Sequence, residues 1–142
     1  MEKRLKIFLV DDDAVYIKLL AAEFLAHVNY DITCFSSGEQ CLKNITQHPD
    51  IVVLDFHLDG IQVNAMNGLQ TLVAIKEFNQ GIPVIMLSSQ DKIDVAVQCM
   101  HNKASDYIVK SETAFMRLQK SINAILLQKK MEKQLAWYMD RM

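Results

Sequence analysis

Residues 5–13 read LKIFLVDDD, a short run rich in aliphatic and aromatic side chains that ends in three consecutive aspartates. A run of this length, followed at once by turn-prone acids, is typical of a strand buried inside a protein. It is too short to be the apolar core of a signal sequence or a membrane span. The stretch therefore predicts a buried strand with a cluster of carboxylates at its carboxyl end.

The same kind of apolar run returns four more times along the chain. The runs are YDITCF at 30–35, DIVVLDF at 50–56, VIMLS at 84–88 and DYIVK at 106–110. Segments with helical spacing alternate with them, at 14–27, 36–48, 67–78, 91–102 and 111–142. This alternation predicts an α/β fold of three layers, a doubly wound (βα)5 arrangement. Its parallel sheet is buried on both faces under helices, so each strand is expected to be buried on both sides.

Polar residues precede the first two helical segments and are suited to cap them. Asp13 stands before the first segment, and Ser36 or Ser37 before the second. Within the first segment, four apolar residues recur at helical spacing: Val15, Leu19, Ala22 and Ala26. This spacing predicts a helix over residues 14–27.

Ionisable and hydroxyl groups stand at the carboxyl ends of four of these runs. They are Asp11, Asp12 and Asp13, then Asp55, then Ser88 and Ser89, then Lys110. In an open parallel sheet the ligand site lies beyond the carboxyl ends of the strands, so we expect these groups to converge. Clustered carboxylates repel one another, and a hard divalent cation such as Mg²⁺ relieves that repulsion. A cation, a hydroxyl and a lysine together suit a phosphoryl group.

The order of these strand ends resembles a known family. LVDDD, VVLDF, VIMLSS and DYIVK, taken together, look like the receiver domain of bacterial two-component response regulators. FSSGEQCL and HPDIVVLD look like the second helix and third strand of that family, and the resemblance covers residues 4–125. It implies a flavodoxin-like sheet with strand order 2-1-3-4-5.

The resemblance also implies roles for the acidic residues. Asp55 would be the phosphoacceptor, attacking the phosphorus of a phosphohistidine on a partner protein. Asp12 would bind Mg²⁺ directly and Asp11 mostly through water. The backbone carbonyl of His57 and the Asp55 carboxylate would complete the metal ligands. The His57 side chain is expected to be an exposed loop histidine.

Three further residues have implied roles in phosphorylation. Lys110 and the Ser88 hydroxyl would bind phosphoryl oxygens as charge develops on them. Tyr107 matches the switch aromatic, which follows Ser88 inward once the phosphoryl group is bound. Phosphorylation would then bias a two-state element through one local change of charge.

The resemblance implies partners rather than a metabolic reaction. A sensor histidine kinase or a phosphotransfer protein would supply the phosphoryl group. A downstream protein effector, or an output domain fused beyond residue 142, would read the conformational change. We expect a phosphoacceptor signalling domain rather than an enzyme, with self-catalysed phosphorylation and dephosphorylation.

Two other classes of function stay open at this stage. One is a pseudo-receiver, which has the same fold but acts as an interaction module without phosphorylation. The other is a phosphatase of the haloacid-dehalogenase type, which also uses a strand-end aspartate and Mg²⁺. That class needs a second aspartate two residues after the first, where this chain has His57.

The sequence departs from the receiver pattern in three places. The segment from Asp55 to Gly68 is longer than in the family, which predicts an insertion in the loop 57–66, and Leu58 and Asp59 replace the usual Met-Pro. Ser111 rather than proline follows Lys110, and Lys103 stands where a helix-ending glycine is common. None of these changes removes a group that phosphoryl transfer needs.

The last helical segment carries two apolar stripes. The first is expected to pack on the sheet: Phe115, Leu118, Ile122 and Ile125. The second extends past the body: Leu127, Met131, Leu135, Tyr138 and Met142. We therefore divide the chain into a receiver domain at 1–126 and a helical extension at 127–142. An isolated apolar stripe is marginal in water, so a homodimer or coiled-coil contact and a linker to a following domain are the alternatives.

Composition excludes several other classes. The formal net charge of 142 residues is −2, so no basic field attracts nucleic acid, and no apolar run reaches the length of a membrane span. Three cysteines without a CxxC pair argue against a disulfide scaffold or a zinc site. We expect reduced thiols in a cytoplasmic protein, with no direct contact to nucleic acid or membrane.

Overall fold

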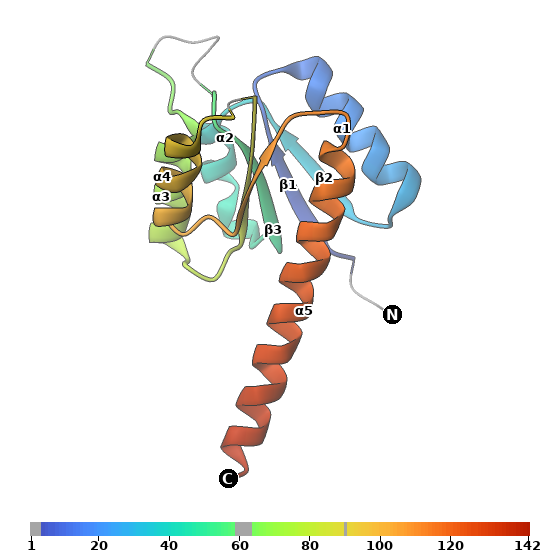
Figure 1. The fold of residues 1–142 in the computed structure, drawn as a ribbon, viewed down its shortest axis with the longest axis vertical. Coiled ribbons are helices and arrows are strands. Elements are labelled where there is room, and N and C mark those ends of the chain that lie inside the picture. The colour runs from blue at the N-terminus through green and yellow to red at the C-terminus, as the bar shows by residue number, and fades with distance from the viewer. Residues whose placement is uncertain (1–3, 59–63, 90) are drawn as a thin grey trace.

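The computed structural model describes residues 4–58, 64–89 and 91–142, and Figure 1 shows their strands and helices in alternation. The strands are β1 (Lys6–Val10), β2 (Asp31–Phe35), β3 (Ile51–Asp55), β4 (Val84–Ser88) and β5 (Asp106–Val109). The helices are α1 (Ala14–His27), α2 (Gly38–Lys43), α3 (Gly68–Phe78), α4 (Ile93–His101) and α5 (Ala114–Asp140). A short 3₁₀ helix spans Ile45–Gln47.

The strands form one parallel sheet in the order β2-β1-β3-β4-β5. This confirms the predicted flavodoxin-like topology. Every residue of β3 and β4 is buried, but β2 and β5 are only partly buried. The prediction that each strand is buried on both faces is therefore wrong for these two, because an edge strand has a neighbour on one side only.

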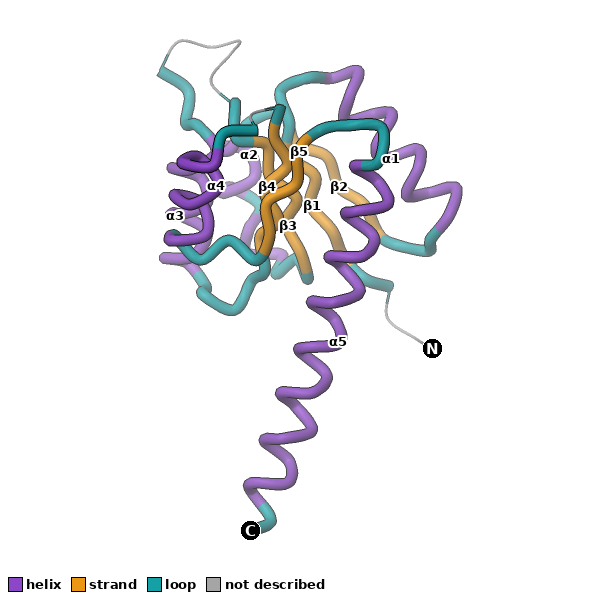
Figure 2. The backbone as a smooth tube through the Cα atoms, in the orientation of Figure 1, coloured by secondary structure: helices purple, strands orange, loops and turns teal. Residues whose placement is uncertain are grey.

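Helices cover both faces of the sheet, so the core has two halves. Helices α1 and α5 lie on one face, and α2, α3 and α4 lie on the other (Figures 1 and 2). Strand β1 shows how one strand serves both halves. Ile7 and Leu9 pack toward α1 and α5, whereas Phe8 and Val10 pack toward the other helices. This is the period-2 alternation of a strand covered on both sides.

Local capping sets where the helices begin. Asp13 caps α1, since its side chain accepts hydrogen bonds from the backbone of the first turn. Ser37 rather than Ser36 caps α2, and its Oγ accepts from the Gln40 N–H. Helix α2 ends at Lys43 instead of His48, because the Asn44 side chain bonds back to the Gln40 carbonyl and the chain tightens into the 3₁₀ turn.

The stripe that indicated helix α1 is not its buried face. Val15 and Leu19 are 69% and 63% exposed. The buried residues of α1 are Ile17, Leu20 and Phe24. The exposed residues and the buried residues both follow helical spacing, so periodicity alone does not tell which stripe is buried. The aromatic ring of Phe24 and the branched side chains beside it pack on the sheet and α5, and the other stripe is left facing outward.

Helix α5 begins on the sheet and continues past it. Its first part packs on the core through Leu118 and Ile122, as predicted. The helix still contacts the body at Lys129, whose Nζ donates to the Gly81 carbonyl at 2.9 Å, and the part beyond it projects away (Figures 1 and 2). Across the described ranges, none of the helices combines the length and the apolar character that a membrane crossing needs.

The three cysteines are free thiols, as expected. Lys103 has φ of 76°, the left-handed conformation that favours glycine.

Candidate functional site

Strand register brings the predicted site residues to one edge of the sheet. Val10 pairs with Leu54, so Asp11 and Asp55 follow neighbouring positions on β1 and β3. Asp55 pairs in turn with Leu87 of β4, next to Ser88. Lys110 is anchored there as well, since its N–H donates to the Ser88 carbonyl at 2.8 Å. The predicted convergence of the strand ends is confirmed.

The carboxylates at this edge are buried and close together. Asp11 is 5% exposed and Asp55 is 4% exposed. Asp11, Asp12 and Asp55 each offer a carboxylate oxygen, and these three oxygens lie within 4.8 Å of one another. Lys110 supplies the positive charge: its Nζ lies 2.8 Å from Asp11 Oδ2 and 3.6 Å from Asp55 Oδ2. One ammonium among three carboxylates leaves the cluster with an excess of negative charge.

This environment shifts the pKa values of the two central groups. Burial first, and then the charge of Asp11, raise the pKa of Asp55 to about 7 against the opposing effect of Lys110. Burial alone would lower the pKa of Lys110. Its hydrogen bond to Asp11 and the charge of Asp55 outweigh burial, so the pKa of Lys110 is raised. Lys110 is therefore a fixed positive charge, and Asp55 is poised between its two protonation states near neutral pH.

The acidic cluster fits a hard divalent cation. Carboxylate oxygens are the ligands that Mg²⁺ prefers, and Mg²⁺ also retains water, which the half-buried Asp12 leaves room for. The surplus negative charge and the raised pKa of Asp55 are the conditions that a bound cation relieves. The residues of this site therefore suit the predicted metal.

His57 lies directly beside the acidic cluster. Its backbone N–H donates to Asp55 Oδ1 at 3.3 Å. Its side chain is half-buried, with the ring 5.1 Å from that of Phe56, so the expectation of an exposed loop histidine is wrong. The apolar Phe56 ring beside it shields the imidazole from water. The metal-ligand role of the His57 carbonyl stays a prediction.

Ser88 and Tyr107 lie on neighbouring strands and contact each other. Ser88 is fully buried, and its side chain shares a hydrogen bond with the half-buried Tyr107. Burial raises the pKa of Tyr107, and the charge of Asp55 acts in the same direction. The hydroxyl that is predicted to bind the phosphoryl group is thus linked directly to the predicted switch residue.

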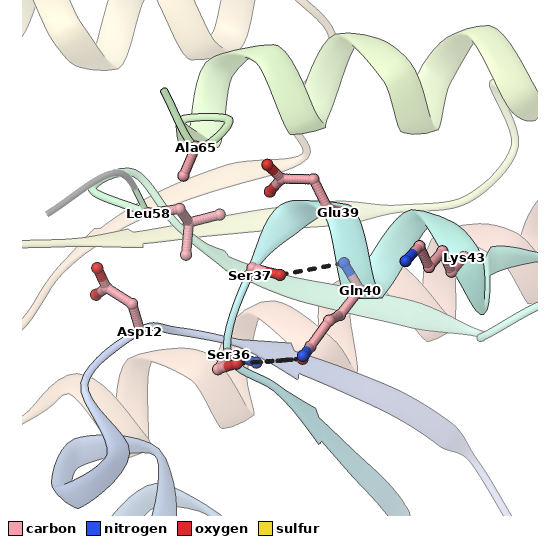
Figure 3. A pocket seen from close by; sticks show the side chains of 8 residues that line it. All are labelled: Asp12, Ser36, Ser37, Glu39, Gln40, Lys43, Leu58 and Ala65. Atoms are coloured by element: carbon pink, nitrogen blue, oxygen red, sulfur yellow. Dashed lines mark hydrogen bonds between the residues drawn. The ribbon is translucent and has the colours of Figure 1, made fainter. Parts of the chain in front are cut away.

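A polar cavity of about 320 Å³ opens beside Asp12, as Figure 3 shows. The start of α2 supplies most of its wall, including Ser36 and Glu39, and Leu58 and Ala65 close it from the predicted loop insertion. Glu39 Oε2 accepts a hydrogen bond from the Met66 N–H at 3.1 Å, which ties the end of that loop to α2. Residues 59–63, including Asp59, lie outside the described part of the chain.

Gly68, the first residue of α3, lies against the backbone of the site. Its N–H donates to the Phe56 carbonyl at 2.8 Å. A Cβ at this position would lie 2.3 Å from the Asp55 carbonyl oxygen and 2.5 Å from Phe56 Cα. Only glycine permits so close an approach, so Gly68 fixes how α3 packs against the end of β3.

Sequence reasoning missed one residue of this site, Tyr16. The Lys110 ammonium lies over the Tyr16 ring, 4.4 Å from its centroid. Burial raises the pKa of the Tyr16 hydroxyl although Lys110 opposes the change. The available sequence clue was the position of Tyr16 one helical turn after the cap Asp13, which places it at the carboxyl edge of the sheet.

The fold and the site together define a class of protein: a flavodoxin-like α/β domain with carboxylates and a lysine gathered at the carboxyl edge of its sheet. A family model described as the response regulator receiver domain matches residues 7–123. The chain therefore belongs to the response regulator receiver family, the signalling domains of two-component systems.

Individual relatives agree with this assignment. ZraR, a transcriptional regulatory protein of Klebsiella oxytoca, is 31% identical over 124 residues, which cover 87% of this chain and 27% of the relative. ORR27, a two-component response regulator of Oryza sativa subsp. japonica, is 34% identical over 115 residues, 78% of this chain and 17% of the relative. The crystal structure of NtrX from Brucella abortus shares a TM-score of 0.81 and 26% identity, covering 96% of this chain and 30% of NtrX. The chain thus spans less than a third of each.

Proposed function

We propose that this receiver domain accepts a phosphoryl group on Asp55 from the phosphohistidine of a sensor kinase or phosphotransfer protein. The observation that carries the proposal is the placement of a buried carboxylate 3.6 Å from a lysine ammonium at the carboxyl edge of the sheet. In the transfer, an Asp55 oxygen attacks phosphorus and forms the O–P bond. The P–N bond to the donor imidazole breaks, and its electron pair stays on the imidazole nitrogen.

Each neighbouring group has a role in that step. The attacking carboxylate must be ionised, and the Lys110 charge favours the ionised form of Asp55. The Lys110 ammonium forms an ion pair with Asp55, 3.6 Å from Oδ2, so it would lie beside the phosphoryl oxygens on which charge develops. The Ser88 hydroxyl donates to a phosphoryl oxygen.

Magnesium completes the site in this proposal. Asp11, Asp12, Asp55 and the His57 carbonyl would hold Mg²⁺, and the three-carboxylate cluster supports this assignment. When bound, the cation supplies the positive charge that lets phosphoryl oxygens approach the carboxylates. Lys110 alone does not balance the cluster, so we expect phosphorylation to require the metal.

Signalling follows from the contact between Ser88 and Tyr107. Once Ser88 turns toward the phosphoryl group, its hydrogen bond to Tyr107 is lost and the ring moves inward. This movement changes the surface around β5, where a downstream protein effector or a fused output domain would read it. We place the domain in the cytoplasm, without direct contact to nucleic acid.

We further propose that residues 1–126 are the receiver and that 127–142 is an extension through which two copies associate. Met131, Leu135, Tyr138 and Met142 follow the spacing of a seven-residue repeat. Met131 and Leu135 are 58% and 61% exposed, and two parallel copies would cover the same stripe on each other. Sedimentation tests this: L135E should yield monomers, and Q134E, beside the stripe, should not. A wild-type chain that is monomeric at high concentration would refute the association.

Intact mass after incubation with Mg²⁺ and a small acyl phosphate tests the phosphoacceptor. The wild type should gain one phosphoryl group, and D55N should gain none. D31N is the matched control, because Asp31 is an exposed carboxylate at the opposite edge of the sheet, and it should be phosphorylated normally. A chelator should abolish the gain. Absence of any gain in the wild type would favour the pseudo-receiver, an interaction module of the same fold.

A further inference from the structure

Lys110 is held by three groups, and only two of them are acids. Its Nζ makes ion pairs with Asp11 and Asp55, and it lies 4.4 Å from the centroid of the Tyr16 ring. At this distance a cation over a ring face is attracted by the negative charge of the π system. The Lys110 side chain is 17% exposed, so the ring also replaces water that would otherwise solvate the ammonium.

The backbone holds Tyr16 rigidly. Asp13 Oδ1 accepts hydrogen bonds from the Val15 and Tyr16 N–H groups, both at 3.1 Å. The Asp13 N–H in turn donates to Asp11 Oδ1 at 2.9 Å. Tyr16 is therefore joined to the acidic cluster by a short chain of hydrogen bonds, and its ring packs on the same core as α1 and α5.

The need for such a support follows from the two unequal ion pairs. Lys110 lies closer to Asp11, at 2.8 Å, than to Asp55, at 3.6 Å. A lysine has a long flexible stem, and the Asp11 contact alone could be kept with the ammonium swung away from Asp55. The Tyr16 ring limits that movement, because leaving Asp55 would also mean leaving the ring face.

We propose that Tyr16 is a positioning residue that holds the Lys110 ammonium beside Asp55 through a cation–π contact. This inference rests on the proposed phosphoacceptor function and adds a residue to it. Tyr16 contacts the Lys110 ammonium and takes no direct part in the bond to phosphorus. It acts through Lys110, which keeps its charge where the phosphoryl oxygens arrive.

Phosphorylation rates with a small acyl phosphate and Mg²⁺ test the role of the ring. Y16L should be slower by roughly fivefold to tenfold, the size of effect expected from one partly desolvated cation–π contact. Y16F, which retains the ring face, should recover most of the rate. Y30L is the matched control: Tyr30 is also half-buried and packs on the same core, but it contacts Phe24 and Gln119 rather than Lys110.

A double-mutant cycle separates positioning from general damage to the fold. In a K110M background, Y16L should have no further effect on the rate, because the cation is gone. An equal loss in both backgrounds, or a slow Y16F, would overturn the inference. So would a Y16L variant that is phosphorylated at the wild-type rate.

The contact is also measurable in the unphosphorylated protein, which separates this inference from the proposed function. NMR should show the Lys110 side-chain methylene protons shifted upfield by the ring in wild type and Y16F, and at ordinary positions in Y16L. A wild type that is never phosphorylated would remove the phosphoacceptor function, and the NMR result would then decide the positioning role by itself. Unshifted Lys110 protons in the wild type would refute it.

Discussion

The strand-end site and the projecting part of α5 depart from the usual distribution of side chains in opposite directions. The site buries charge: Asp11 and Asp55 are 5% and 4% exposed. The projecting helix exposes apolar groups: Met131 and Leu135 are 58% and 61% exposed. Buried charges and exposed apolar patches are the two arrangements that a fold does not adopt for its own stability.

The two regions differ in whether the same chain supplies a partner: an opposite charge for the buried carboxylates, or a cover for the exposed apolar stripe. Lys110 stands against the buried carboxylates, so the site is organised by a single chain. Within the described residues, the projecting stripe of α5 has no comparable cover. The site thus has a partner charge within the domain, and the proposed association of two copies would supply the cover that the extension lacks.

The largest effect on stability is expected from removing the charge of Asp55 in protein that a chelator keeps free of metal ions. The pKa of Asp55 is raised from 3.8 to about 7, so between these values the folded protein binds more protons than the unfolded chain. Its stability should therefore fall as pH rises from 3.8 to about 7 and level off above that. D55N should lose this pH dependence and be more stable at pH 8, by at most about 4 kcal/mol.

Urea unfolding at pH 5 and pH 8 measures this difference. Added Mg²⁺ should restore wild-type stability at pH 8 and have a much smaller effect on D55N. If the free energy of unfolding depended on pH in the same way in both proteins, the surroundings would not raise the pKa of Asp55.

The next effect concerns the close packing of the site. G68A should destabilise the domain by about 3 kcal/mol, because its Cβ meets the backbone of Asp55 and Phe56 rather than a side chain that can move. The matched control is G81A, whose Cβ meets only the Asn79 side chain, at 3.1 Å. It should stay within about 0.5 kcal/mol of wild type in the same unfolding experiment. Equal stability of the two variants would contradict the close approach.

Two leucines of α5 compare its packed and projecting parts directly. L118A removes a fully buried side chain and should cost about 3 kcal/mol. L135A should cost less than about 0.5 kcal/mol when unfolding is measured at a concentration where the chain is monomeric. If L135A were as costly as L118A under those conditions, the projecting stripe would have a partner within its own chain.

The smallest effect on stability is expected from substitutions on the exposed stripe of α1. This stripe lies near the site, but its apolar residues are exposed like those of the extension. L19S should change the free energy of unfolding by no more than about 0.5 kcal/mol. L20S, one position away and 7% exposed, should cost several times more. Thermal melts of the two variants measure both effects. If L19S destabilised the protein more than L20S, α1 would pack through its other face.

Much of the fold and site was predictable because the relevant patterns are local. The first strand and the first helix were placed within a residue of their observed bounds, since an apolar run, an acidic end and the Asp13 cap are all contiguous. The convergence of Asp11, Asp55 and Lys110 followed from parallel topology, which brings all strand ends to one edge. Neither inference required knowledge of which side chains touch.

The errors arose where a choice depended on contacts between distant segments. Helix α1 carries two apolar stripes, and Phe24 packing against Phe115 of α5 helps decide which one is buried. His57 is half-buried because the Phe56 ring lies against it, a contact that loop composition does not indicate. Helix α2 stops early because of a side-chain bond at Asn44.

Residue type and spacing were enough to predict the alternation of strands and helices, the acids and the lysine at the strand ends, and the two stripes of the last helix. The folded chain was needed to show that Tyr16 meets Lys110, that Ser88 meets Tyr107 and that the end of the last helix projects from the body. The physical reason is that such contacts depend on how packed layers align, and each side chain is placed by neighbours remote in sequence.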